Sequence, residues 1–373
     1  MKNYGIIMEL NPLHYGHKYI IDTIKEKYKP DLITVIISGY FTMRGEVSIM
    51  RKENKVKELL KLGVDLIIEL PTSKTLNSGQ LYAKNAIQIL ALSNITDLVF
   101  GVENCTVEDL KRIIDIEKRE DFSYTFKKNL EKYRSQKISY SKTILELSNN
   151  SMLEQLSLKS NNTLGLEYLK ALEEYPDIVP HVISRVGCEE TNKELNNLPS
   201  GTAIRNAFIN GKNVKKFIIG DSTSLVRVNE DALNSILKYQ LISYKNVDLP
   251  IISEGIDNYI IKNIDLSKTF RENIDNLANK KYSKSRIRRT ILQMILCTEP
   301  EKTKELRILG FSESGMKHLS TIRNVKMFSS IKDAPKKYSE NEKKAYYLYS
   351  IITKTDNNLQ EYLYPLKEDS WKN

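Results

Sequence analysis

Short apolar runs alternate with helix-periodic segments over the first hundred residues of the chain. The runs at 5–10, 32–37, 65–70 and 98–101 contain few polar side chains and predict buried strands. Because strands and helices alternate with short connections, we expect an α/β fold with a Rossmann-like, doubly wound parallel sheet. In such a sheet the loops that follow the strands gather at one edge, where ligands bind.

The pattern changes in residues 106–175, which are charged, periodic at helical spacing and poor in β-branched runs. This pattern predicts a helical insertion, and a further strand is expected at 181–186. Beyond about residue 215 the pattern is mostly helical, and no strand–loop–helix motif is identified. A chain of 373 residues exceeds the size of an ordinary single core. We therefore expect an α/β domain at 1–215, which includes the insertion, and a mostly helical domain at 216–373.

The sequence His-Tyr-Gly-His at 14–17 opens the helix that follows the first strand. Backbone N–H groups in the first turn of a helix, together with the positive end of its dipole, form an anion site. Gly16 lets the backbone approach a ligand closely, and His14 and His17 add donors at the same point. A single histidine there would most often be structural, but two at this spacing favour phosphate binding.

A second motif of the same kind occurs at 200–205, Ser-Gly-Thr-Ala-Ile-Arg. Ser200 is expected to cap a helix, and Arg205 projects from the next turn toward an anion held there. Two anion sites on one sheet indicate a polyphosphate ligand. Arg44 and Glu46 lie in a glycine-containing loop after the second strand, where a functional role and a plain surface ion pair both remain open.

The net charge of +10 suggests a polyanionic partner, although a composition rich in Lys, Asn and Ile offers a plainer explanation. Local clustering favours RNA. The stretch 280–289 carries six basic residues with no acid between them. Tyr282 is expected to be available for stacking, and Arg286 and Arg289 to lie off the apolar face of the helix. The alternative is a solvated helix face. The expected RNA contacts are Lys280, Lys281, Tyr282, Lys284, Arg286 and Arg289.

Hydrophobic content of 40% and charged content of 28% are typical of a globular protein. No apolar stretch approaches the length of a membrane span, and the N-terminus lacks the features of a secretory signal. The three cysteines are scattered without metal-ligand spacing. A cytoplasmic protein without membrane contact is expected. Oligomeric state is not indicated.

The motifs at 11–17 and 200–205 together resemble the His-x-Gly-His nucleotidyltransferase superfamily, which uses both to hold a nucleoside triphosphate. Further motifs narrow this resemblance to the bacterial tRNA(Met) cytidine acetate ligase family. They are Ser-Gly at 38–39 with Met-Arg-Gly-Glu at 43–46, Gly-Val-Asp-Leu-Ile-Ile-Glu-Leu-Pro at 63–71, Phe-Gly-Val-Glu at 100–103, Asn-Asn-Thr-Leu-Gly at 161–165, and Lys-Tyr-Ser at 281–283 followed by Arg286 and Arg289.

The resemblance implies a two-step reaction. Acetate attacks the α-phosphorus of ATP to give acetyl-adenylate and pyrophosphate, and the wobble cytidine of elongator tRNA(Met) then takes the acetyl group on N4. Charge that develops on the phosphates would be stabilised by His14, His17, Arg44 and Arg205. The implied ATP contacts are Ile7, Met8, Glu9, Leu10, Asn11, Pro12, Leu13, His14, Tyr15, Gly16, His17, Lys18, Tyr19, Ile20, Gly101, one or both of Asn161 and Asn162, Arg185, Ser200, Thr202 and Arg205.

Magnesium usually accompanies such phosphates, and no residue is assigned as a metal ligand because Mg²⁺ often relies on the substrate's own oxygens. The chain departs from the family pattern at 187–191, where the family usually has a Gly-Tyr-His-Asp-like loop, and at Gly201, where alanine is common. Two other functions remain open. One is transfer of a nucleotide to a small phosphorylated substrate, and the other is a non-catalytic RNA-binding or ribosome-associated role.

Overall fold

A mostly parallel sheet forms the centre of the protein, and the computed structural model describes residues 1–185, 198–243, 254–298, 304–355 and 364–367. The strand order is β5-β4-β1-β2-β3-β6-β7, with β8 paired to β6. The strands from β1 to β5 pair in parallel, as expected for βαβ units. Their bounds are β1 Asn3–Met8, β2 Leu32–Ser38, β3 Leu66–Leu70, β4 Asp97–Val102 and β5 Val179–Ser184.

Helices cover both faces of this sheet, which confirms the doubly wound arrangement. On one face α1 (Tyr15–Tyr28), α2 (Lys52–Lys61) and α10 (Gly201–Ile209) bury apolar side chains against β1 and β2. On the other face α4 (Gly79–Leu92) packs, with the short α3 (Thr72–Thr75) before it. Ile37 belongs to the first core and Ile36 to the second, because successive side chains of a strand point to opposite faces.

The edge of the sheet beyond β3 is built by the second half of the chain, which the sequence did not predict. Strand β6 (Glu305–Phe311) pairs antiparallel with β3, and both β7 (Lys326–Phe328) and β8 (Leu366–Lys367) pair parallel with β6. Ser312 then caps helix α15 (Glu313–Leu319). The sheet is therefore mostly parallel with one antiparallel pair, and the expectation of no strand–loop–helix motif after residue 215 is wrong. Arg307 interrupts the apolar pattern of β6, which hid the strand.

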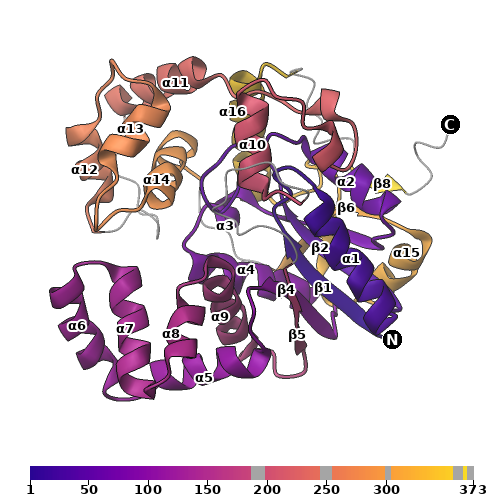
Figure 1. Cartoon of the computed structure of the whole chain (residues 1–373). Coiled ribbons are helices and arrows are strands. Elements are labelled where there is room, and N and C mark those ends of the chain that lie inside the picture. The colour runs from indigo at the N-terminus through magenta and orange to yellow at the C-terminus, as the bar shows by residue number, and fades with distance from the viewer. Residues whose placement is uncertain (186–197, 244–253, 299–303, 356–363, 368–373) are drawn as a thin grey trace.

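The expected helical insertion is confirmed, and a second helical group follows later in the chain (Figure 1). The insertion, at the lower left of Figure 1, contains α5 Val107–Glu117, α6 Phe122–Tyr133, α7 Gln136–Ser148, α8 Ser151–Ser157 and α9 Ser160–Leu172. The second group, at the upper left, contains α11 Glu230–Ser243, α12 Ile256–Asn263, α13 Phe270–Leu277 and α14 Lys284–Leu296. Helix α16 (Lys336–Thr353) contacts α11 and α14, and two 3₁₀ turns lie at Lys215–Phe217 and Ser222–Ser224.

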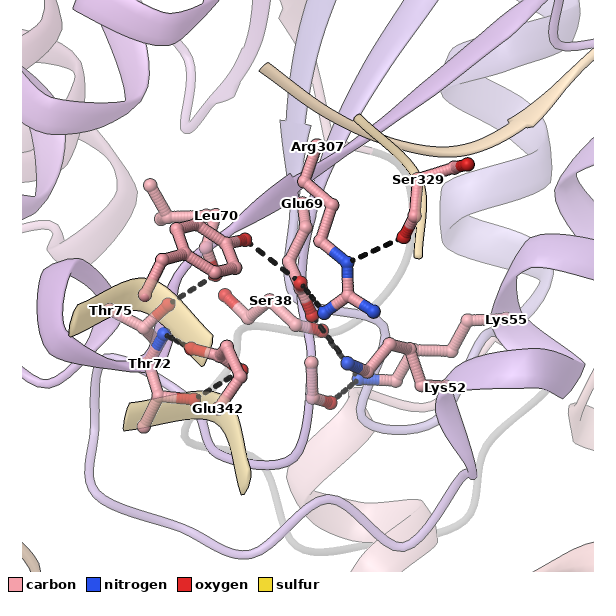
Figure 2. Close-up of polar contacts among 12 residues, drawn as sticks. Ser38, Lys52, Lys55, Glu69, Leu70, Thr72, Thr75, Arg307, Ser329 and Glu342 are labelled. Atoms are coloured by element: carbon pink, nitrogen blue, oxygen red, sulfur yellow. Dashed lines mark hydrogen bonds and ion pairs between the residues drawn. The ribbon is translucent and has the colours of Figure 1, made fainter. Parts of the chain in front are cut away.

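Buried charges join the two halves of the chain at β3 (Figure 2). The Glu69 carboxylate accepts from Lys52 of α2, from Arg307 of β6 at 2.6 Å and from the Tyr338 hydroxyl of α16 at 3.0 Å. The side chains of Lys52, Glu69 and Arg307 have no exposed surface. The division of the chain near residue 215 stays a prediction, and elements after it contribute both to the sheet and to the second helical group.

Lys55 fixes the ends of the strands that carry the site. Its Nζ donates to the carbonyl oxygens of Glu9 at 2.9 Å, Ser38 at 3.0 Å and Gly39 at 2.9 Å. Burial lowers the pKa of Lys55 to about 7. One ammonium group thus holds together the chain segments that leave β1 and β2.

Candidate active site

Both histidines of the first motif lie at the N-terminus of α1, and the backbone fixes their tautomers. His14 caps the helix by accepting the Gly16 N–H on Nδ1 at 3.0 Å, and His17 accepts the His14 N–H on Nδ1 at 3.2 Å. The two ring centroids are 4.0 Å apart. Since a neutral imidazole with an accepting Nδ1 carries its proton on Nε2, each ring presents an Nε2–H donor.

The surroundings keep these rings neutral. Burial, followed by the charges of Arg185 and Arg205, lowers the pKa of His14 to about 3. Burial and the neighbouring His14 hold the pKa of His17 well below its ordinary value. Neutral rings that donate from Nε2 suit the electrostatic role expected from the sequence, which is stabilisation of charge on phosphate oxygens.

Gly16 is required because the His14 ring packs directly over it. A Cβ atom at this position would lie 2.8 Å from Cε1 and 3.0 Å from Nδ1 of His14. The absence of a side chain therefore allows His14 to fold back over the first turn and cap it.

The second motif faces the first, as the sequence predicted. Ser200 caps α10 by accepting the Ala203 N–H at 3.2 Å. A Cβ atom at Gly201 would lie 3.6 Å from Nε2 of His14, so the two helix N-termini approach each other. Arg205 donates to the Asn11 carbonyl at 2.7 Å and to the Thr202 hydroxyl at 3.1 Å. Two sets of helix N–H groups and a fixed guanidinium thus converge on one space.

This space is a cavity of about 240 Å³ at the carboxyl ends of the parallel strands. Most of the expected ATP contacts line it, together with Arg44 and Glu46. They are Ile7, Met8, Glu9, Leu10, Asn11, His14, Gly16, His17, Tyr19, Ile20, Gly101, Asn161, Arg185, Ser200, Thr202 and Arg205. Residues of both anion-binding motifs, 11–17 and 200–205, line the same cavity, so the two motifs meet in the folded protein.

Five expected contacts do not line the cavity. They are Pro12, Leu13, Tyr15, Lys18 and Asn162. Leu13 is fully buried in the core, and Lys18 pairs with Asp22 along α1. Asn162 is fully buried and brackets the Glu103 backbone, accepting its N–H at 2.8 Å and donating to its carbonyl at 3.1 Å. Of the two asparagines, Asn161 is the one that reaches the cavity, while Asn162 shapes the loop after β4.

The apolar wall of the cavity was missed by the sequence analysis. It includes Met43, Phe100, Leu164 and Tyr168. The sequence contained a signal for part of this wall. Leu164 and Tyr168 are four residues apart on α9, so they share one helix face, and they lie on the same helix as Asn161. The altered loop at 187–191 lies outside the described residues.

Glu9 and residues of the loop 42–46 also line the cavity. The Glu9 carboxylate accepts the Met43 N–H through Oε1. Burial raises the pKa of Glu9. Glu46 forms an ion pair with Arg205 of α10 at 2.7 Å and faces Arg288 of α14 at 3.8 Å. It therefore links two distant helices at the cavity and is not a plain surface ion pair.

Helix α14 packs directly against this loop. A Cβ atom at Gly45, whose φ is +69°, would lie 2.7 Å from both Cβ of Arg288 and the backbone nitrogen of Arg289. Arg289 donates to the Met43 carbonyl at 2.9 Å. Helix α14, which is expected to hold RNA, therefore also packs against the loop that lines the cavity.

Two expectations for the basic stretch need correction. Tyr282 is 4% exposed and donates its hydroxyl to the Glu254 carbonyl at 2.8 Å, so its ring is not available for stacking. Arg289 is 9% exposed and does not lie on the outer face. Tertiary packing explains both, because Tyr282 joins the core of α12–α14 and Arg289 turns toward the loop 42–46. Lys280, Lys281 and Lys284 are exposed, and Arg286 is partly exposed beside Glu254 at 3.2 Å.

Neither a metal cluster nor a membrane span is found in the described part of the chain. No group of three or more His, Cys, Asp or Glu side chains there is arranged to hold a metal ion. None of its helices combines the length and apolar character needed to cross a membrane.

Known proteins resemble this chain over nearly its whole length. The model of the HIGH Nucleotidyl Transferase family matches residues 1–362. A tRNA(Met) cytidine acetate ligase of Clostridium novyi is 33% identical, over 94% of this chain and 95% of the relative. One of Staphylococcus saprophyticus is 32% identical over 87% of each chain.

Solved structures show the same fold. Thermotoga maritima TmcAL in its apo form superposes with a TM-score of 0.84 at 23% identity and covers 98% of this chain and 99% of its own. The structure of that protein bound with alpha-thio ATP gives a TM-score of 0.80 with the same coverage. The chain therefore belongs to the family of tRNA(Met) cytidine acetate ligases within the HIGH nucleotidyl transferases.

Proposed function

We propose that this protein joins acetate to N4 of the wobble cytidine in elongator tRNA(Met), with ATP converted to AMP and pyrophosphate. The names of its relatives support tRNA(Met), cytidine and acetate as substrates, and the neighbour bound with alpha-thio ATP supports ATP. The observation that carries the chemistry is the convergence of two helix N-termini, two neutral histidines and Arg205 on one cavity. The reaction is cytoplasmic because its acceptor is tRNA.

In the first step a carboxylate oxygen of acetate attacks the α-phosphorus of ATP. The new O–P bond forms as the bond to the bridging oxygen breaks, and its electron pair leaves with pyrophosphate. Negative charge grows on the phosphate oxygens, and His14, His17 and Arg205 supply fixed donors to it. Because both histidines stay neutral, they act by donating hydrogen bonds rather than by accepting a proton.

The nucleotide occupies the cavity, with its triphosphate between α1 and α10 and the remaining contacts from Gly101, Asn161 and Arg185. Arg44 also lines the cavity and adds a charge for the phosphates or for acetate. A Mg²⁺ ion bound with ATP would neutralise phosphate charge, and such an ion often relies on the oxygens of the nucleotide itself. Lys280, Lys281, Lys284 and Arg286 contact the RNA backbone.

The test combines the purified chain with ATP, acetate and an unmodified elongator tRNA(Met) transcript. Mass spectrometry of nucleosides should detect N4-acetylcytidine, and AMP should form in equal amount. The His17→Ala variant should lose pyrophosphate release, whereas a non-catalytic RNA-binding protein would show none to lose. Release of pyrophosphate with a small phosphorylated acceptor, independent of acetate and tRNA, would contradict the proposal and indicate a nucleotidyltransferase.

A further inference from the structure

The second step of the proposed reaction requires a proton acceptor. When N4 of cytidine forms a bond to the carbonyl carbon of acetyl-adenylate, the C–O bond to the phosphate breaks and its electron pair leaves with AMP. The nitrogen must lose a proton, because its lone pair is delocalised into the pyrimidine ring and the protonated adduct is a strong acid. A positioned side chain that takes this proton accelerates such a step by about 10²–10⁴-fold.

The two histidines are excluded from this task by their hydrogen bonds. Both Nδ1 atoms accept backbone N–H groups, at 3.0 and 3.2 Å, so the Nε2 atoms that face the cavity carry protons. Guanidinium groups and tyrosine hydroxyls are protonated at neutral pH and offer no better acceptor. Among the described residues that line the cavity, the carboxylates are Glu9 and Glu46, and we seek the base between these two.

Glu46 is already engaged by positive charge. Its Oε2 pairs with Arg205 at 2.7 Å, and its Oε1 faces Arg288 at 3.8 Å. Glu9 differs, because only its Oε1 is held, by the Met43 N–H. Across the described part of the chain, Oε2 of Glu9 has no hydrogen bond or ion pair. Of the two carboxylates, Glu9 has an oxygen available to a substrate.

Glu9 is linked to the helix that is proposed to hold the RNA. The Glu9 carboxylate accepts the Met43 N–H, and the Met43 carbonyl accepts from Arg289 of α14 at 2.9 Å. Helix α14 and the loop before it carry the exposed side chains of Lys280, Lys281 and Lys284. A base of an RNA bound to that surface would enter the cavity beside the loop 42–46, which Glu9 contacts.

We propose that Glu9 is a catalytic residue of the second step, the general base that removes the proton from N4 of cytidine as the acetyl group is transferred. This inference rests on the proposed function. The Met43 N–H holds the carboxylate through Oε1, and Oε2 takes the proton and later releases it to water. This proton transfer belongs to the second step alone, so loss of the Glu9 carboxylate should slow transfer of the acetyl group more than formation of acetyl-adenylate.

The surroundings of Glu9 act on its basicity in both directions. Burial raises the pKa of Glu9, which strengthens the carboxylate as a proton acceptor. The Met43 N–H and the cations Arg44 and Lys55 oppose this rise, while Glu46 adds to it. The other groups that interact with Glu9 are Arg289, Tyr82 and Tyr168.

The experiment measures the two steps separately in Glu9→Gln, which keeps the size of the side chain and an oxygen to accept the Met43 N–H but cannot take a proton. Step one is followed as acetate-dependent exchange of labelled pyrophosphate into ATP without RNA. Step two is followed in a single turnover, by mixing enzyme-bound acetyl-adenylate with the tRNA(Met) transcript. We expect Glu9→Gln to slow transfer by about 10²–10⁴-fold more than it slows exchange.

The control is Glu46→Gln, the same chemical change in the other carboxylate of the cavity. It should slow exchange through Arg205 and leave the rate of transfer relative to exchange unchanged. Glu9→Asp, which keeps a shorter carboxylate, should recover part of the transfer rate. Transfer at the wild-type rate in Glu9→Gln, or an equal loss in both steps, would overturn the proposal for Glu9. Exchange without any acetylation of RNA by the wild type would instead overturn the proposed function.

Discussion

The carboxylate of Glu46 holds the guanidinium of Arg205 at 2.7 Å. Arg205 is bound at the same time by the Asn11 carbonyl and the Thr202 hydroxyl, so three segments of the chain determine its position. Glu46 in turn belongs to the loop that packs on α14. The placement of a phosphate-binding arginine therefore depends on a loop that also contacts the proposed RNA-binding helix.

The first prediction concerns this ion pair. Glu46→Ala should lower the turnover of acetate-dependent pyrophosphate exchange by about 10- to 100-fold, because Arg205 loses the group that orients it. The KM for ATP should change less, since the positive charge remains in the cavity. Glu46→Gln, which still offers an oxygen to Arg205, should recover most of the rate. Equal activity in Glu46→Ala and the wild type would show that Asn11 and Thr202 suffice to position Arg205.

The second prediction separates two arginines that the sequence assigned to the same role. Arg289→Ala should impair pyrophosphate exchange in the absence of RNA, because the Met43 carbonyl loses its partner and the loop that carries Arg44 and Glu46 is weakened. Arg286→Ala should leave exchange unchanged and weaken RNA binding. The measurements are exchange rates without RNA and the affinity for tRNA at several salt concentrations.

A matched control for the second prediction is the double variant Lys281→Ala and Lys284→Ala on the exposed side of the same region. It should leave exchange intact, and each lost phosphate contact should reduce the salt dependence of binding by about one unit of slope. If Arg289→Ala also leaves pyrophosphate exchange intact and weakens only tRNA binding, the hydrogen bond from Arg289 to Met43 does not contribute to the first step.

The motifs that could be predicted from the sequence depend on local chemistry. A helix N-terminus after a strand forms an anion site through its own backbone, so His14 and Ser200 identify it without knowledge of the rest of the fold. The meeting of the two motifs follows from parallel strands, whose ends share one edge of the sheet. These conclusions required only short stretches of chain and the right-handed βαβ connection.

The features that could not be predicted depend on distant partners. Strand β6 was missed because Arg307 breaks its apolar run, and that arginine is buried only because Glu69, 238 residues away, accepts its hydrogen bond. Tyr282 and Arg289 resemble surface residues in sequence but are covered by α12, α13 and the loop 42–46. A hydrophobic pattern assigns polar side chains to the surface, so a buried polar residue cannot be recognised from it until its partners are known.

The third prediction concerns the pH dependence of stability. His14 has a pKa of about 3 in the folded protein against 6.5 in the unfolded chain, so below pH 6.5 the unfolded chain binds the proton more strongly. The stability conferred by neutral His14 is therefore complete above pH 6.5 and is lost as pH falls from 6.5 toward 3. Asparagine also caps helices but does not titrate, so His14→Asn should flatten this decline.

The measurement is the urea unfolding midpoint of the wild type and of His14→Asn, compared at neutral pH and at about pH 5. The midpoint of the wild type should fall more between the two conditions than that of the variant. Parallel falls in both proteins would mean that other groups, such as the neighbouring His17, dominate acid unfolding.

The fourth prediction concerns the buried charges around Glu69 (Figure 2). Glu69→Gln leaves Lys52 and Arg307 without their shared anion in a site with no exposed surface. Removal of one partner from a buried ion pair leaves an uncompensated charge, so the free energy of unfolding should fall by about 3–5 kcal/mol. Urea unfolding followed by circular dichroism measures this change. Glu174→Gln is the control, because Glu174 and its partner Lys84 are each 55% exposed and should contribute no measurable stability. A loss in Glu69→Gln no larger than that of the control would show that Tyr338 and the neighbouring aromatic rings stabilise the two cations unaided.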